Sequence, residues 1–309
     1  MSAEFLKIRA MNRKPGLMLA LMLCLSACST PLVLPEQDLP PSQLIESADL
    51  QDVQTIALQL AGAVGKDQVL VIYDLDNTLL AMEQDLGSDQ WYDWQKGLQT
   101  VDRCDPRLVS DRLAAQGALY YASAMRLTQP DGAELVRAVQ DQGFDSIVLT
   151  SRGADFSAAT LRELRRNGFD FTRKPIGDSD TLQFKPTPES RDTLYESGVY
   201  LTAGQNKGEM LLALLQATGT ALPKAIVMAD DKQANLQDVL DALAGQAASV
   251  QALRYNREDA RVAAFDGAHT VTQWRLAEPA LLQLQALFGS DNFQLPQPAL
   301  PGGCPPSQP

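Results

Sequence analysis

The sequence predicts an α/β fold in which helices flank a Rossmann-like parallel sheet, and three observations support this. Short apolar runs of strand length recur along the 309 residues. Stretches with helical apolar spacing alternate with these runs, which is typical of a parallel sheet covered by helices on both sides. Polar residues directly follow three of the runs, at the carboxyl edge where such sheets bind their ligands.

The predicted elements extend over one main domain, residues 43–290. The predicted strands are 69–73, 146–150, 225–229 and, more weakly, 249–255. The predicted helices are 44–61, 133–142, 157–167, 207–218 and 235–244. Residues 81–128 lie between the first strand and the helix that leads to the second. This length leaves room for a small helical cap, inserted after the first polar motif.

The first 27 residues have the pattern of an export signal. Basic residues precede an apolar run over 17–27 that is too short to span a bilayer. The run ends in Leu25-Ser26-Ala27-Cys28, which resembles the bacterial lipobox. This resemblance implies a lipoprotein signal peptide over 1–27, a lipidated Cys28 and, with Ser29 next, an outer-membrane location facing the periplasm. An ordinary signal-peptidase site with an incidental cysteine is the alternative.

Proline-rich segments flank the main domain. Residues 28–42 predict an extended spacer after the lipidated cysteine, and residues 291–309 predict a disordered tail. Cys104 and Cys304 are the other cysteines of the exported chain, and an oxidising compartment permits a disulfide between them. A free Cys104 is equally compatible with the sequence.

The net charge and the histidine content exclude some classes of partner and mechanism. The formal net charge of -12 repels the phosphate backbones of nucleic acids, so we expect no nucleic-acid partner. The sequence has one histidine, His269, which excludes mechanisms and metal sites that need two. We expect His269 to be a surface or structural residue. Phosphate chemistry in this chain would therefore depend on carboxylates.

The polar residues at the strand ends form an ordered set of motifs. They are Asp74, Asp76 and Thr78 after the first strand, Thr150 after the second, Lys207 at a helix start, and Asp230 and Asp231 after the third strand. In order and spacing this set resembles the four motifs of the haloacid dehalogenase (HAD) superfamily, which implies the HAD fold. Together with the lipobox-like sequence, the segment Gly87-Ser88-Asp89-Gln90-Trp91 resembles a branch of HAD-like bacterial lipoproteins and, more distantly, the class C outer-membrane acid phosphatases. The fourth motif, Asp230-Asp231-Lys232, differs from the Gly-Asp-Asn type of those phosphatases. Lys174 and Lys185 are alternatives to Lys207 as the third-motif lysine.

The resemblance implies a role for each motif residue. Asp74 is the nucleophile that forms an aspartyl-phosphate, and Asp76 is the general acid and base. The implied phosphate-binding residues are Thr150, Ser151 and Lys207. The implied ligands of Mg²⁺ are Asp74, Asp76 through its backbone carbonyl, Asp230 and Asp231. A hard cation suits this set, because it prefers oxygen ligands and balances clustered carboxylates.

Two groups of residues allow more than one interpretation. The cap segment contains five aromatic residues that either stack on an aromatic or nucleoside leaving group or form the core of the cap. They are Trp91, Tyr92, Trp94, Tyr120 and Tyr121. We expect at least three of them to be core. Arg152, after the second strand, either holds substrate or pairs with an acidic neighbour.

These observations predict a lipid-anchored, Mg²⁺-dependent phosphomonoester hydrolase, a HAD-type phosphatase that acts on a small phosphorylated molecule. In the superfamily that the motifs resemble, an acid two residues after the nucleophile is typical of phosphatases and phosphomutases. Two alternatives remain open. One is a HAD-fold binding or envelope-assembly lipoprotein with little turnover. The other is a phosphotransferase, in which an acceptor alcohol replaces water.

Overall fold

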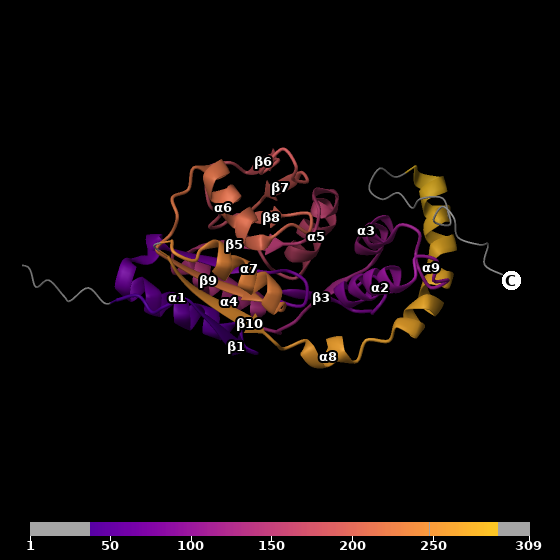
Figure 1. Ribbon diagram of the computed structural model, residues 1–309, viewed down its shortest axis with the longest axis horizontal. Coiled ribbons are helices and arrows are strands. Elements are labelled where there is room, and N and C mark those ends of the chain that lie inside the picture. The colour runs from indigo at the N-terminus through magenta and orange to yellow at the C-terminus, as the bar shows by residue number, and fades with distance from the viewer. Residues whose placement is uncertain (1–37, 247, 290–309) are drawn as a thin grey trace, which may run out of the picture. The chain divides into compact units, whose positions relative to one another are not determined.

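The computed structural model describes residues 38–246 and 248–289, and its main part is built on an eight-stranded sheet (Figure 1). The strand order is β1-β10-β9-β2-β5-β8-β7-β6. The first six strands in this order run parallel, and β7 and β6 are antiparallel to their neighbours. The strands are β1 (Gln43–Ser47), β2 (Val69–Tyr73), β5 (Asp145–Thr150), β6 (Thr181–Phe184), β7 (Thr193–Glu196), β8 (Val199–Leu201), β9 (Ala225–Asp230) and β10 (Ser249–Tyr255).

Helices cover both faces of the sheet, so the predicted mixed α/β class with a largely parallel sheet is confirmed. The helices are α1 (Gln51–Val64), α2 (Asp89–Val101), α3 (Arg112–Ala122), α4 (Gly132–Asp141), α5 (Ser157–Arg166), α6 (Lys207–Thr218), α7 (Gln233–Ala242), α8 (Asp259–Ala263) and α9 (Gly267–Phe288). Two short 3₁₀ turns, η1 (Lys66–Gln68) and η2 (Ala154–Phe156), precede β2 and α5.

The side chains of strand β2 pack against helices on both faces of the sheet. All five of its residues are buried. Val71 and Tyr73 pack with α1, α4 and α5 on one face, and Leu70 and Ile72 pack with α6 and α7 on the other. Because successive side chains of a strand point to opposite faces, a strand covered on both sides has to be apolar throughout.

The register of β2 with its neighbours determines where the site lies. Tyr73 is level with Val148 of β5 and with Ala229 of β9. The residues that follow these three strands therefore leave the sheet at the same carboxyl edge. The backbone N–H of Asp74 extends this register by donating to the carbonyl of Ala229 at 2.8 Å.

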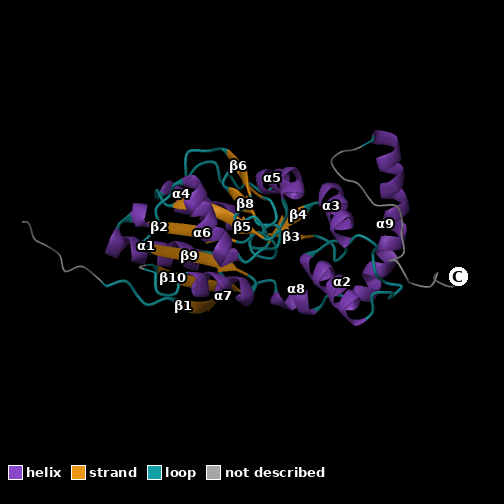
Figure 2. Cartoon of the chain, turned by 45° about the horizontal axis from the view of Figure 1, so that its top comes forward, coloured by secondary structure: helices purple, strands orange, loops and turns teal. Residues whose placement is uncertain are grey.

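The segment after β2 folds separately from the large sheet. Strands β3 (Leu80–Met82) and β4 (Met125–Leu127) pair as a two-stranded antiparallel ribbon. Between them lie α2 and α3, and we call residues 83–124 the insert. Helix α9 lies against α2 (Figure 2). Trp274 of α9 is 6.5 Å from Trp91 between ring centroids, so α9 helps to bury this tryptophan of the insert.

Some sequence expectations need correction. Residues 44–47 were expected in a helix, but they belong to β1, because Leu44 and Ile45 add a parallel edge strand to β10 and the helix begins at Gln51. The spacer was expected to extend to residue 42. Instead, the carbonyl of Pro40 accepts from Ser249 and that of Pro41 from Gln251, so these prolines are attached to the sheet.

Other predictions fall outside the described residues. These are the signal over 1–27, the lipidated Cys28 and the tail over 291–309. Cys104 takes part in a disulfide, and since the other three cysteines lie in those undescribed segments, its pairing with Cys304 stays a prediction. Every helix over 38–246 and 248–289 is too short or too polar to cross a membrane.

Candidate active site and metal centre

Three loops at the carboxyl edge of the sheet bring the motif aspartates together. Asp74 follows β2, Asp230 ends β9 and Asp231 comes next. Carboxylate oxygens of these three residues all lie within 4.8 Å of one another. Asp74 and Asp230 are buried, and Asp231 is half-buried. Residues that are 157 positions apart in the chain thus form one acidic centre.

Lys207 lies inside this centre. Its ammonium donates to Asp74 Oδ1 at 2.5 Å and to Asp230 Oδ2 at 2.7 Å, and its side chain is fully buried. Lys207 is the first residue of α6, and Asn206 caps that helix by accepting from the N–H of Glu209. The cap sets where the helix begins, and so where the lysine enters the site.

Burial and charge shift the titration of these groups. Burial raises the pKa of Asp74 to about 7, Lys207 opposes the rise, and the Asp230 carboxylate adds to it. Burial alone would lower the pKa of Lys207, but Asp230 and Asp74 outweigh it and raise that pKa above its ordinary value. Lys207 is therefore charged at neutral pH. Burial, together with Asp74 and Asp230, also raises the pKa of Asp231 well above its usual range.

The donor set fits a hard divalent cation. Three carboxylates and one ammonium leave excess negative charge in a place that water reaches poorly, and burying such charge is costly. Asp230 already accepts from Lys207, from the Asn235 amide at 3.0 and 3.1 Å, and from the N–H of Lys232. Oxygen ligands of this type are those that Mg²⁺ prefers.

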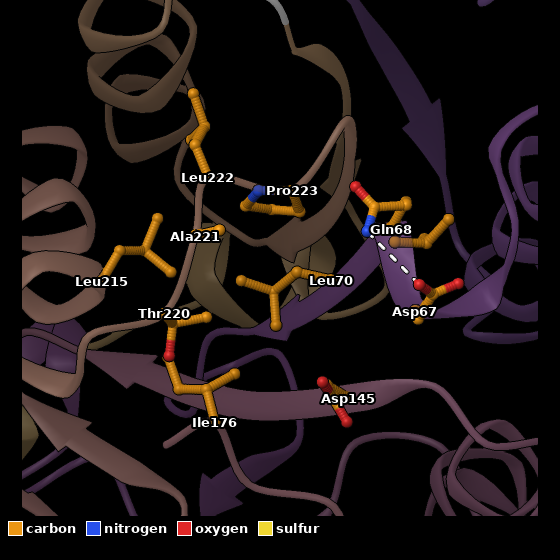
Figure 3. A pocket seen from close by; sticks show the side chains of 11 residues that line it. Asp67, Gln68, Leu70, Asp145, Ile176, Leu215, Thr220, Ala221, Leu222 and Pro223 are labelled. Carbon is orange, nitrogen blue, oxygen red and sulfur yellow. Dashed lines mark hydrogen bonds between the residues drawn. The ribbon is translucent and has the colours of Figure 1, made fainter.

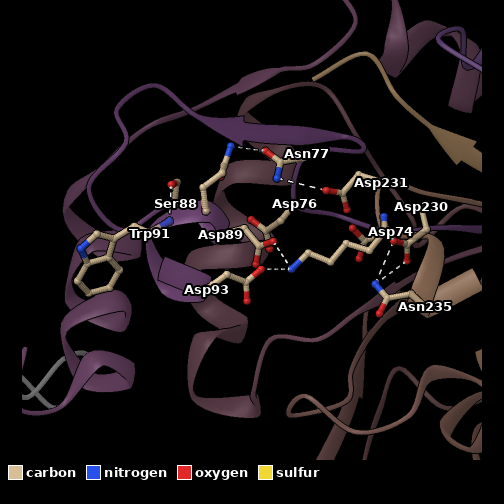
Figure 4. A network of polar contacts seen from close by, with 12 residues as sticks. Asp74, Asp76, Asn77, Ser88, Asp89, Trp91, Asp93, Asp230, Asp231 and Asn235 are labelled. Atoms are coloured by element: carbon tan, nitrogen blue, oxygen red, sulfur yellow. Dashed lines mark hydrogen bonds and ion pairs between the residues drawn. The ribbon is translucent and has the colours of Figure 1, made fainter. Parts of the chain in front are cut away.

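The loop after β2 is bent so that its polar groups face the centre. Asn77 has a left-handed backbone, with φ at 59°. Thr78 donates to Asp74 Oδ2 at 3.4 Å, and its oxygen accepts from the N–H of Asp231 at 3.0 Å. The amide of Asn77 donates to Asp231 at 3.4 Å (Figure 4). The first and fourth motifs are thus joined by hydrogen bonds.

Asp76 is held by Arg152. Both guanidinium bonds are short, 2.9 Å from Nε to Oδ2 and 2.8 Å from Nη2 to Oδ1. Arg152 is buried, donates to Thr160 at 2.9 Å, and lies 3.8 Å above the Tyr120 ring centroid. Burial alone would lower the pKa of Arg152, but Asp76 outweighs it and raises that pKa. Arg152 was expected either to hold substrate or to pair with an acidic neighbour, and the structure shows the pairing, with Asp76.

The three expected phosphate-binding residues differ in their burial and in their contacts. Thr150 ends β5 and is buried, and its hydroxyl oxygen accepts from the N–H of Arg152 at 3.3 Å. Ser151 is exposed. Lys207, by contrast, bonds directly to Asp74 and Asp230. Thr150 lies at the same edge of the sheet because β5 is paired with β2.

The insert contributes residues that sequence reasoning missed. Lys232 donates to Asp89 at 2.6 Å and to Asp93 at 2.7 Å, both from α2. Gln90, next to Asp89, donates from its amide to Asn77 at 3.5 Å. Apart from the resemblance of segment 87–91 to those lipoproteins, their sequence signal is that Asp89 and Asp93 lie about one helical turn apart. Sequence alone cannot show which loop that face meets.

The aromatic residues of the insert are packed rather than open. Trp91 and Tyr120 are buried, and Trp94 packs with Phe265 at 6.0 Å. Tyr92 lies against the guanidinium of Arg112, 4.9 Å from the ring centroid. The expectation that at least three of the five rings form core agrees with these contacts.

A pocket of about 130 Å³ lies at the opposite, amino edge of the sheet (Figure 3). Its lining includes Leu70 and Asp145 from β2 and β5, together with Ile176, Leu215 and Asp67. The motif aspartates are not among its lining residues. The chemistry of the acidic centre therefore does not extend to this pocket.

Fold and site together define a class: a mixed α/β protein with a largely parallel sheet and a buried acidic centre at the carboxyl edge of that sheet. Residues 46–286 match the family model described as "Protein of unknown function (DUF2608)", and the chain belongs to that family. No curated protein matches the chain. Among solved structures, the HAD domain of effector protein Lem4 from Legionella pneumophila is similar at 14% identity and a TM-score of 0.33, over 60% of this chain and 86% of that one.

Proposed function

We propose that the protein is a Mg²⁺-dependent phosphomonoester hydrolase that uses Asp74 as its nucleophile. One observation carries this proposal: Lys207 bridges Asp74 and Asp230 inside a group of three carboxylates at the carboxyl edge of the sheet. A phosphate ester resists attack because its oxygens are anionic, so a site needs cations, fixed donors and a positioned nucleophile. The acidic centre with Lys207 offers these parts.

In the first step an Asp74 oxygen attacks phosphorus and the bond from phosphorus to the ester oxygen breaks. The product on the protein is an aspartyl-phosphate, and the leaving oxygen takes up one proton. Lys207 stabilises the Asp74 carboxylate, and we expect its ammonium to contact the phosphoryl oxygens as well. Thr150, on the neighbouring strand, supplies a further hydroxyl at this edge.

Asp76 is the candidate group for proton transfer. It gives a proton to the leaving oxygen, then takes one from the water that attacks the aspartyl-phosphate, so the net reaction consumes one water and releases an alcohol and phosphate. Both of its oxygens are bonded to Arg152. One of these bonds has to open or be shared when Asp76 meets the substrate, which makes Arg152 a positioning residue.

Asp74, Asp230 and Asp231 would hold the cation, with the backbone carbonyl of Asp76 as a further ligand. Bound there, Mg²⁺ would neutralise part of the negative charge on the phosphoryl oxygens. Asn235 and the N–H of Lys232 orient Asp230 for this role. Such supporting bonds fix the direction of a ligand carboxylate.

The export signal and the lipobox-like sequence extend the proposal to location. The mature chain would begin at Cys28, carry lipid there, and face the periplasm from the outer membrane. Mass measurement of Cys28 in membrane fractions tests this part. A Cys28→Ala chain that stays in the membrane fraction would contradict it.

The test of the catalytic proposal is phosphate release from a panel of small phosphomonoesters, with and without Mg²⁺. We expect release that requires Mg²⁺ and is lost in Asp74→Asn. Asp67→Asn, at the opposite edge of the sheet, is the matched control and should retain activity. A folded, Mg²⁺-binding protein that releases no phosphate would favour a binding or envelope-assembly role. Transfer of phosphate to an added alcohol would favour a phosphotransferase.

A further inference from the structure

We propose that the site selects phosphomonoesters whose leaving group carries an ammonium, and that Asp89 and the side-chain carbonyl of Gln90 bind this ammonium. The inference rests on the proposed function and names its substrate class. It assigns specificity to the first turn of α2, which the insert places beside the catalytic loops. A 2-aminoethyl ester of phosphate is the simplest compound of this class.

Asp89 lies close to Asp76, the candidate acid for the leaving oxygen (Figure 4). It is the first residue of α2, and its carboxylate is bonded to Lys232, the residue after Asp231. Burial raises the pKa of Asp89, Lys232 opposes the rise, and the Asp76 carboxylate adds to it. We therefore expect a substrate atom beyond the leaving oxygen to come close to Asp89.

Gln90 provides an independent sign of a missing ligand. Its side chain is only 8% exposed, and its amide nitrogen donates to Asn77 in the loop after β2. Its carbonyl oxygen is buried and accepts no hydrogen bond from any described residue. A buried acceptor without a partner is costly, so we expect a donor here that the described residues do not supply. The substrate's ammonium has three N–H groups and can supply it.

The ion pairs of Lys232 show that Asp89 and Asp93 can bind an ammonium group. It lies between Asp89 and Asp93 at 2.6 and 2.7 Å. Its side chain is 38% exposed, against 24% for Asp89 and 52% for Asp93. Lys232 can therefore keep its bond to the outer carboxylate, Asp93, while a substrate ammonium takes the inner one, Asp89.

The balance of charge around Asp89 also favours a cationic leaving group. Two insert carboxylates face one lysine, beside the acidic centre that will already hold a phosphate dianion. An anionic leaving group would be repelled from this region, a neutral one would leave the Gln90 carbonyl without a charged donor, and a cationic one would be attracted. Neutral polyols and acidic esters are thus disfavoured relative to amino alcohols.

The test is a calorimetric titration of the full chain carrying Asp74→Asn, with Mg²⁺, so that binding is measured without turnover. The probes are 2-aminoethyl phosphate, propyl phosphate and carboxymethyl phosphate, which place an ammonium, a methyl and a carboxylate at one position. We expect the ammonium probe to bind at least about tenfold more tightly than the other two. Adding Asp89→Asn should bring this ratio close to one. Adding Asp93→Asn, which also removes a Lys232 partner, should leave the preference in place.

Each outcome decides a different question. Equal binding of the three probes overturns the ammonium site, and tighter binding of the carboxylate probe overturns it and assigns Lys232 to an anionic leaving group. Phosphate release from the same esters by the unmutated chain is measured in parallel. Release without preference overturns the ammonium site alone. Preference without release sustains that site and overturns the hydrolase. No binding to the variant together with no release by the unmutated chain overturns both.

Discussion

Lys207 determines the charge balance of the acidic centre. Its ammonium is fully buried between the carboxylates of Asp74 and Asp230. Removing one partner of a buried ion pair leaves a charge that water cannot stabilise. We therefore expect Lys207→Met to lower the free energy of unfolding by about 3–5 kcal/mol in metal-free buffer, as measured by urea denaturation. Mg²⁺ should recover part of this loss, because the cation replaces the missing charge.

Lys232→Met is the matched control for that experiment. Lys232 also bridges two aspartates, but its side chain is 38% exposed, so solvent screens the pairs. We expect a loss of at most about 1 kcal/mol. Equal losses for the two lysines would show that burial of Lys207 does not have the assigned effect.

Arg152 fixes Asp76 through two short bonds and is itself fixed by Thr160 and the Tyr120 ring. Without the guanidinium, Asp76 loses its defined orientation toward the leaving group. Misplacement of a catalytic group by about 1 Å can cost roughly 100-fold in rate. We expect Arg152→Met to lower kcat by about 10- to 100-fold with a smaller change in KM, measured by steady-state phosphate release.

Thr160→Val separates orientation of Asp76 from simple loss of packing near Arg152. It removes one hydrogen bond to Arg152 and keeps both bonds to Asp76. Its loss in kcat should be much smaller. A loss equal to that of Arg152→Met would contradict the positioning role.

Helices α6 and α7 lie close together at Gly208. A Cβ added there would lie 2.1 Å from the backbone carbonyl oxygen of Asp238, so the helices would have to separate. Gly208 follows Lys207, and the shift would move the lysine from the aspartates. We expect Gly208→Ala to destabilise the fold by about 1–3 kcal/mol and to lower kcat, measured by thermal melting and phosphate release.

Gly62→Ala in α1 is the control for helix propensity. A Cβ at Gly62 would meet nothing within 4 Å, and alanine favours a helix over glycine by about 1 kcal/mol. This variant should be slightly stabilised. Destabilisation of both variants would mean that the clash at Gly208 is not the cause.

The sequence predicted elements well where a strand is buried on both faces. Strands β2, β5, β9 and β10 agree with the expected ranges within one residue, because a continuous apolar run leaves little ambiguity. Strands β6, β7 and β8 were not predicted, since they are short and two of them are only partly buried. Residues 44–47 were assigned to a helix because four residues are too few to distinguish the two periodicities.

The candidate site could be predicted to the extent that it lies at strand ends. Asp74, Asp230 and Asp231 follow central strands, so the parallel sheet alone brings them together. Asp89 and Gln90 could not be predicted, because their contact depends on how α2 meets the loops of the sheet. That placement depends on packing such as Trp91 against Trp274, between residues far apart in the sequence.

The acidic centre makes the stability of the whole molecule depend on pH. Folded Asp74 has a pKa of about 7, against an ordinary value of 3.8. Between about pH 4 and 7 the folded state therefore binds more protons than the unfolded state, and the free energy of unfolding falls as pH rises. We expect metal-free protein to melt at a higher temperature near pH 5 than near pH 7.5.

Asp74→Asn should flatten this dependence, because asparagine does not titrate. Mg²⁺ should stabilise the unmutated protein more at pH 7.5 than at pH 5, since its carboxylate ligands must first lose their protons. Melting curves across pH 4–8, with and without Mg²⁺, measure both effects. An unchanged slope in the variant would assign the pH dependence to other groups.

The central claim, that Asp74 is the nucleophile, is tested most directly by trapping its phosphorylated form. The protein is mixed with an excess of phosphomonoester and Mg²⁺, quenched in acid and reduced with borohydride, which converts an aspartyl-phosphate to homoserine. Peptide mass spectrometry then locates the modified residue. The account predicts homoserine at position 74, dependent on both substrate and Mg²⁺. Modification at Asp76 instead, or phosphate release with an unmodified Asp74, would contradict it.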